Sequence, residues 1–238
     1  MHHAFIDKYS DLKSPMHELD PRAKIVVFLI FIIALVLTPP SHLFQFAGFF
    51  AMITVVGVLS KVPASYVMKR SLLVLPFVIF VALTIPFQSL NPHKQYFVVV
   101  FLKSWMSASA LILLSATTPF PDLLKGLEAL KVPKLIVTLL SFMYRYIFVL
   151  TDEAMRMEAA RNSRYFGGHY IRQVKVYFGM IGSLFINTFE RAERVYQCMA
   201  ARGFTGEIKS VNRFELSEYD IIFALFFIAS MLALEIFL

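Results

Sequence analysis

The chain has 238 residues, of which 58% are hydrophobic and only 16% are charged. Soluble domains are about half apolar and about a quarter charged, so this composition excludes an ordinary soluble domain. The mean hydropathy of +0.67 favours a membrane protein. The formal net charge of +7 does not indicate a nucleic-acid partner, because the lysines and arginines lie beside apolar runs, as in cytoplasmic loops of membrane proteins.

Four apolar runs fill the first half of the chain, and their lengths suit a hydrocarbon layer of about 30 Å. They cover residues 25–37, 43–59, 71–87 and 96–118. Asp20 and Pro21 form a helix-start signal before the first run. A short amphipathic piece, 63–70, precedes the third run, in which Pro76 predicts a kink. Lys103, near the start of the fourth run, is expected to snorkel to the outer interface.

The second half of the chain is more charged and predicts two long helices. Pro119-Phe120-Pro121-Asp122 signals a helix start before the amphipathic stretch 123–130. A long helix is expected from Lys134 to Arg161, and Gly167-Gly168 breaks it. A second long helix is expected from Tyr170 to Arg202, ended by Gly203. An apolar run, 221–238, closes the chain.

The distribution of basic residues predicts the topology. If the N-terminus is cytoplasmic, the outer turns hold only Lys94, with Lys103 just inside the bilayer, and the other 21 of the 23 basic residues face the cytosol. Segment 134–150 is apolar enough to span. A spanning 134–150 would separate Lys125, Lys131 and Lys134 from the later arginines, so we expect it to lie along or dip into the inner leaflet.

The predicted fold class is therefore an all-α, polytopic membrane protein with about five transmembrane helices and a cytosolic helical domain built on two long crossing helices. Three parts are expected: transmembrane helices in 1–118, a cytosolic or interfacial domain in 119–217, and a last transmembrane helix in 218–238.

Two similar sequences end the long helices: Ala160-Arg161-Asn162 and Ala201-Arg202-Gly203. Alanines keep the last turn slim enough to enter a groove on another protein. The arginine presents a planar fork of donors to carboxylates or carbonyls. A single copy would more simply complement the helix dipole. Two copies, each closing a long helix in one charged segment, favour docking to a partner.

Other chemistry has little support in the sequence. The histidines lack metal-ligand spacing, no Walker lysine loop occurs, and no catalytic arrangement stands out. We therefore predict no catalytic residues, no metal and no cofactor, and we expect Cys198 to be a small buried filler. The alternatives are a membrane-embedded lipid-modifying enzyme and a self-sufficient carrier, for which Lys103 and Arg145 are the candidate intramembrane charges.

The chain resembles the transmembrane T component of energy-coupling-factor (ECF) transporters, specifically the cobalt-type CbiQ family. The resemblance covers nearly all of the chain. Besides the two Ala-Arg ends, it rests on Leu19-Asp20-Pro21-Arg22-Ala23-Lys24, Thr117-Thr118-Pro119-Phe120, Leu123-Leu124, Val132-Pro133, Tyr144-Arg145-Tyr146 and Asp152-Glu153.

This resemblance implies a non-catalytic coupling subunit in a prokaryotic cell membrane, with two ATP-binding cassette ATPases and an integral substrate-binding subunit as partners. In that family an Ala-Arg-Gly motif ends each of two coupling helices, and each arginine docks into one ATPase. Arg202 matches fully. Arg161 matches with Asn162 in place of glycine, a residue that also tolerates a left-handed cap, and Arg164 is a rival for the same role. The moved ion would be cobalt or nickel.

Arg145 has two interpretations. It forms either a polar contact with the substrate-binding partner or an internal pair with Asp152, two turns along the same helix, and the internal pair is slightly favoured.

Overall fold

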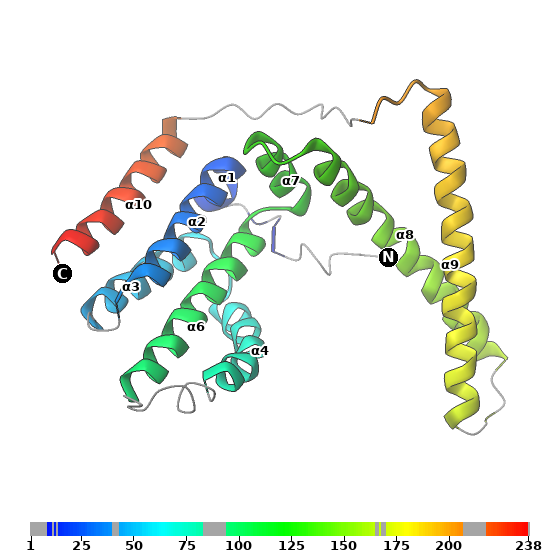
Figure 1. Ribbon diagram of the computed structural model, residues 1–238, viewed down its shortest axis with the longest axis horizontal. Helices are drawn as coiled ribbons and strands as arrows, with labels where there is room; N and C mark the ends of the chain where they lie inside the picture. Colours follow the sequence, from blue (N-terminus) through cyan, green and yellow to red (C-terminus); the bar gives the residue numbers. More distant parts are fainter. Residues whose placement is uncertain are drawn as a thin grey trace. The chain divides into compact units, whose positions relative to one another are not determined.

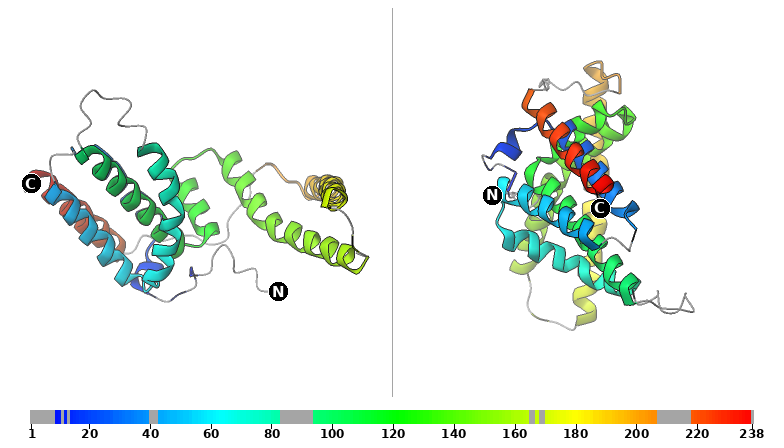
Figure 2. Two further views of the ribbon diagram at one scale, coloured as in Figure 1. Left: turned by 90° about the horizontal axis from the view of Figure 1, so that it is seen from below. Right: turned by 90° about the vertical axis from the view of Figure 1, so that its left-hand side faces the viewer.

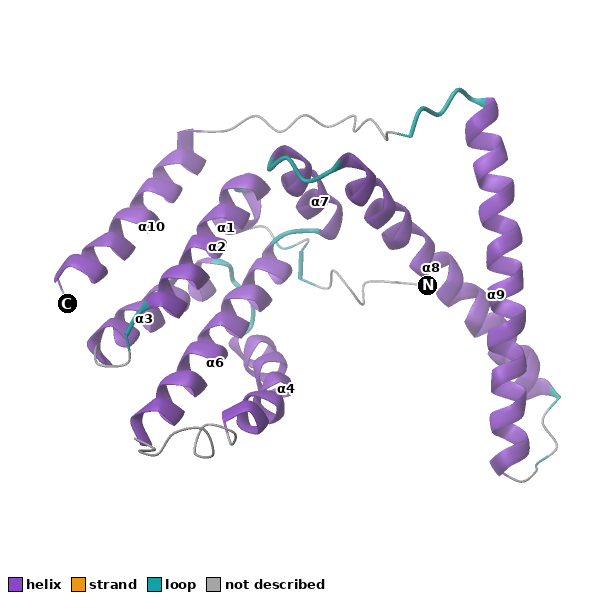
Figure 3. Ribbon diagram, in the orientation of Figure 1, coloured by secondary structure: helices purple, strands orange, loops and turns teal. Residues whose placement is uncertain are grey.

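The computed structural model describes residues 9–10, 12, 14–39, 43–82, 94–164, 167, 170–206 and 218–237, and all regular structure in these ranges is α-helical (Figure 3). This confirms the all-α prediction. The helices are α1 (Pro15–Glu18), α2 (Pro21–Leu37), α3 (Leu43–Leu59), α4 (Ala64–Ala82), α6 (Lys94–Thr117), α7 (Phe120–Ala129), α8 (Lys134–Ser163), α9 (Tyr170–Ala201) and α10 (Glu218–Phe237).

The chain divides into two compact units. The first comprises Met1–Leu130 and Asn212–Leu238, and the second is Lys131–Val211. In the first unit α7 packs against α2, so this unit continues beyond residue 118. The expected boundaries at 118 and 217 separate membrane-spanning parts from a cytosolic or interfacial part, and they stay predictions.

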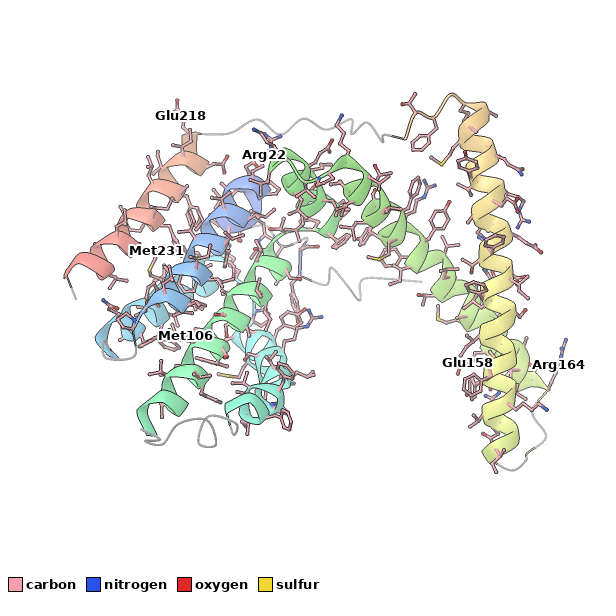
Figure 4. The ribbon with its side chains drawn as sticks, in the orientation of Figure 1. Arg22, Met106, Glu158, Arg164, Glu218 and Met231 are labelled. Atoms are coloured by element: carbon pink, nitrogen blue, oxygen red, sulfur yellow. The ribbon has the colours of Figure 1, made fainter. Side chains whose placement is uncertain are left out.

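The core of the first unit lies where α2 packs between α6 and α10 (Figure 1). Phe31 of α2 is 1% exposed, and its ring lies 5.5 Å from that of Phe49 and 6.1 Å from that of Phe227. Met106 of α6 and Met231 of α10, labelled in Figure 4, are buried in the same cluster. Aromatic pairs at these distances add to the energy of apolar burial.

The outside of this unit is also apolar. Val58, Leu73 and Phe77 are 78%, 80% and 70% exposed, a pattern that water disfavours and hydrocarbon accepts. Within the described residues, Val98–Thr117 and Lys134–Ser163 are long and apolar enough to cross a membrane. The expected total of five spans stays a prediction.

Most element predictions are confirmed within a few residues, including the helix start at Pro119. The amphipathic piece 63–70 and the start of the third run form one helix, α4, which begins at Ala64 and contains Pro76. The Ser71 hydroxyl donates to the carbonyl of Met68 at 3.0 Å, a contact that crosses the junction between them. The predicted end of this run at residue 87 lies outside the described residues.

Polar contacts join the ends of helices that are far apart in sequence. As predicted, Asp20 caps α2: its Oδ1 accepts a hydrogen bond from the backbone N–H of Arg22 at 2.8 Å. Asp220 of α10 then accepts one from the backbone N–H of Asp20, also at 2.8 Å. The ammonium of Lys24, 1% exposed, donates to the carbonyl of Thr117 at 3.2 Å. These contacts fix α2, α6 and α10 at one end of the unit.

Lys103 donates hydrogen bonds to carbonyls at the opposite end of α2. Its Nζ donates to the carbonyls of Val36 and Thr38, both at 2.7 Å. Carbonyls at a helix C-terminus lack partners within the helix, so the ammonium satisfies them and complements the negative end of the dipole. The structure thus gives the side chain a specific target, which the sequence did not indicate.

Asp220→Ala is expected to destabilise the first unit, because it leaves the buried Asp20 N–H unsatisfied and removes a carboxylate near Lys24. The loss should be about 1–3 kcal/mol, and each kcal/mol lowers Tm by about 2–4 °C in a chain of this size. Thermal unfolding in detergent measures it. Glu218→Ala, which removes an exposed carboxylate from the same helical turn (Figure 4), is the control. Equal Tm values for the two variants would contradict the assignment.

Candidate functional site

The second unit is a pair of long helices that cross obliquely and then diverge (Figures 1 and 2). No residue of α8 is buried along its whole length, and α9 exposes Phe178, Phe185 and Phe189 by 69%, 71% and 64%. Stable isolated helices need a packed apolar face. Two helices with so little mutual burial therefore offer most of their surface to other molecules.

The crossing is held by a few polar contacts. The guanidinium of Arg161 lies 4.2 Å from the ring centroid of Tyr177 and donates to its hydroxyl at 2.8 Å. Nearer the start of α8, Glu153 lies 3.6 Å from Arg191 of α9. Glu153 also accepts a hydrogen bond from Arg156 at 2.7 Å. The half-buried Arg161 is therefore tied to its own subunit.

The end of α8 differs from the prediction. Asn162 does not take a left-handed conformation, because it lies inside the helix, which continues to Ser163. The Ser163 hydroxyl donates to the carbonyl of Ala159 at 2.9 Å and supports this extra turn. Arg164 is the C-cap residue, and its backbone N–H donates to the carbonyl of Arg161 at 3.0 Å.

The end of α9 agrees with the prediction. Arg202 follows the last helical residue, Ala201, and its backbone N–H donates to the carbonyl of Met199 at 3.0 Å. Gly203 has a φ of 75°, the left-handed cap that glycine adopts without steric cost. Ala160 and Ala201 are exposed, so both last turns are slim, as expected.

Arg164 and Arg202 therefore hold the same position relative to their helices: each comes directly after the last helical residue and bonds to the carbonyl three residues before it. Both side chains are exposed, and neither makes a hydrogen bond or ion pair within the part of the chain that the structure describes. Figure 4 shows Arg164 at the tip of α8 with its side chain directed outward. Sequence reasoning gave the α8 role to Arg161 first; by geometry Arg164 is the better counterpart of Arg202.

Two adjoining hollows lie between the diverging arms of α8 and α9. The apolar groove, of about 420 Å³, is lined mainly by Leu139, Met143, Leu150, Ala192 and Phe204. The arginine groove, of about 350 Å³, is lined by Arg145, Arg191, Arg194, Arg202 and Cys198. The residues that line both are Phe142, Tyr146, Arg191, Val195 and Met199.

Two residues of the arginine groove correct the sequence interpretation. Arg145 faces this groove and makes no hydrogen bond or ion pair with other described residues, so the structure does not show the favoured pair with Asp152. Cys198 is exposed, not a buried filler.

Among the residues that the structure describes, no group of three or more His, Cys, Asp or Glu side chains could hold a metal ion. Five of the histidines lie outside the described residues: His2, His3, His42, His93 and His169.

Comparison of the sequence with known proteins places the chain in a family. The profile of the CbiQ family, described as cobalt transport proteins, matches residues 12–212, and the chain belongs to that family. An uncharacterised protein of Methanocaldococcus jannaschii is 28% identical over 253 aligned positions, which cover 98% of this chain and 86% of that protein.

Two further relatives carry functional names. The energy-coupling factor transporter transmembrane protein EcfT of Bacillus subtilis is 29% identical over 231 positions, 84% of each chain. The cobalt transport protein CbiQ of Rhodobacter capsulatus is 33% identical over 101 positions, 42% of this chain and 41% of that protein. The family is that of a transporter membrane component, so the chain is a cell-membrane transport protein.

If Arg161 fastens the helix pair and Arg164 does not, their alanine variants should differ in stability. Arg161→Ala removes the stack on Tyr177 and a charged hydrogen bond, so amides near the crossing should exchange about tenfold or more faster, corresponding to about 1.5–3 kcal/mol. Arg164→Ala should leave exchange unchanged. Hydrogen–deuterium exchange read by mass spectrometry measures both, and faster exchange in Arg164→Ala alone would reverse the two roles.

Proposed function

We propose that this chain is the transmembrane coupling (T) subunit of an energy-coupling-factor transporter. It would transmit the motion of two ATP-binding cassette ATPases to a separate integral membrane subunit that holds a cobalt or nickel ion. The family match and the names of the relatives support this role. The observation that carries it is the pair of exposed, unpaired arginines that follow the last residues of two long helices.

The docking sites are proposed at the two helix tips. Arg202, with Ala201 and Gly203, docks one ATPase. At the tip of α8, Ala160, Arg161, Asn162 and Arg164 form the second contact, and Arg164 supplies the guanidinium because Arg161 is engaged with Tyr177. A charge-assisted, bidentate bond to a carboxylate gives such a joint both strength and fixed geometry.

The membrane arrangement is proposed from the apolar surfaces. The helices of the first unit expose large apolar side chains, which favours a multi-pass arrangement of about five spans with a cytoplasmic N-terminus. The first half of α8 is apolar enough to enter a bilayer, but the positive-inside rule keeps its flanking cations on one side. We place it at the inner leaflet, where its apolar side chains contact lipid or a membrane partner.

Coupling requires that the helix pair moves as a lever. Hydrolysis changes the distance between the ATPases, the docked tips follow, and the angle between α8 and α9 changes. The exposed phenylalanines of α9 provide an apolar surface for the substrate-binding subunit. Because the two helices share few contacts outside their crossing, a change of angle breaks little packing.

The alternatives are an inner-leaflet lipid-modifying enzyme and a self-sufficient carrier. Neither is favoured by a specific geometry, since Lys103 is engaged with the end of α2 and Arg145 lies on the helix pair. Co-purification from native membranes separates the three: two ATPase chains and a small integral partner support coupling, and a lone active chain supports an alternative.

Arg202→Ala and Arg164→Ala are expected to weaken ATPase docking about tenfold or more each, since a charged hydrogen bond contributes about 1.5–3 kcal/mol. The amount of ATPase retained on an affinity-tagged chain and ion uptake by cells measure this effect. Lys69→Ala, which removes an exposed cation from α4 of the first unit, should retain full occupancy. Full ATPase retention and normal uptake in the double arginine variant would sink the docking role.

A further inference from the structure

The helix pair has a second feature besides its tips: its apolar groove and its arginine groove adjoin. The residues that line both hollows are Phe142, Tyr146, Arg191, Val195 and Met199, so apolar and cationic surfaces meet without a gap. Of the arginines that line the arginine groove, only Arg202 is shared with the proposed docking. We infer that the space between α8 and α9 is a binding site for one anionic phospholipid, with an acyl chain in the apolar groove and the phosphate against the arginines.

The charges of the site favour an anion. None of the side chains that line either hollow is a carboxylate, whereas Arg145, Arg191, Arg194 and Arg202 converge on one of them. Arg194 lies 3.6 Å from Glu190 in an exposed pair, and such pairs are weak. Arg191 lies 3.6 Å from the half-buried Glu153, a carboxylate that it shares with Arg156. Arg145 and Arg202 make no ion pair within the described ranges. The guanidinium fork matches a phosphate group in shape and charge.

The apolar side of the site favours a lipid over a free anion. The groove of about 420 Å³ is lined by aliphatic and aromatic side chains together with Thr188 and Arg191, and exposure of such a mainly apolar surface to water is unfavourable. The helix that forms one wall, α8, is apolar enough to enter a bilayer. With α8 at the inner leaflet, as proposed above, phospholipid is the molecule in contact with this groove that carries both an acyl chain and an anionic phosphate, and the inference rests on that placement.

The inference does not rest on ATPase docking and is tested on the full chain alone. The purified chain is equilibrated with equal amounts of dioleoyl phosphatidylglycerol and dioleoyl phosphatidylcholine in detergent, and bound lipid is read by native mass spectrometry. We expect one phosphatidylglycerol per chain, preferred by about tenfold or more. Excess inorganic phosphate should not displace it. Equal retention of the two lipids, or displacement by phosphate, would overturn the site.

Variants separate the two halves of the site. Arg145→Ala/Arg194→Ala, which leaves the docking arginines intact, should bring the lipid preference close to one. Ala192→Trp should fill the apolar groove and reduce retention of both lipids several-fold. Arg164→Ala, which removes an exposed arginine at the end of α8 outside both grooves, is the matched control for the isolated chain and should keep the full preference. Circular dichroism confirms folding of each variant. An unchanged preference in the double variant contradicts the inference, as does capture of a protein in place of lipid at these arginines.

Discussion

The contact between Arg161 and Tyr177 is the interaction on which the helix pair depends. Neither long helix has a packed core of its own, and α8 has no buried residue at all. The crossing is instead set by one guanidinium stacked on a ring and by the Glu153–Arg191 pair. A few polar contacts fix where the helices meet, and the core of interdigitating side chains that would hold their angle is missing from α8.

This constraint explains why so much apolar surface remains on the second unit. Phe178, Phe185 and Phe189 on α9, together with the groove beside α8, have no cover within their own unit. Exposed apolar surfaces of this kind mark contact with lipid or protein.

The first unit is built in the opposite way. Polar contacts of Asp20, Lys24 and Asp220 hold one end of α2, and Lys103 holds the other end. The packed bundle of the first unit suits the fixed part of a coupling subunit, and the open helix pair of the second unit suits the part that moves.

The sequence predicted what depends on neighbouring residues. Asp20-Pro21 and Pro119 start helices, and Gly203 stops one, because caps act over a few residues. The sequence did not predict the features that depend on contacts between distant residues or on small differences in conformational free energy. The Asp220–Asp20 bond joins residues 200 apart. Arg145 faces the arginine groove only because α9 crosses α8 at this angle. Asn162 stays helical because its intrinsic penalty, about 0.7 kcal/mol or less, is too small to end a helix.

The proposed coupling requires that nucleotide moves the two helix tips relative to each other. Spin labels at Ser163 and Thr205, beside Arg164 and Arg202, report their separation by double electron–electron resonance, once the exposed Cys198 is replaced by serine. In the assembled transporter, we expect different distances with bound ATP and with ADP, and no difference in an Arg164→Ala/Arg202→Ala variant. A distance that stays the same in both nucleotide states of the unmodified tips would contradict it.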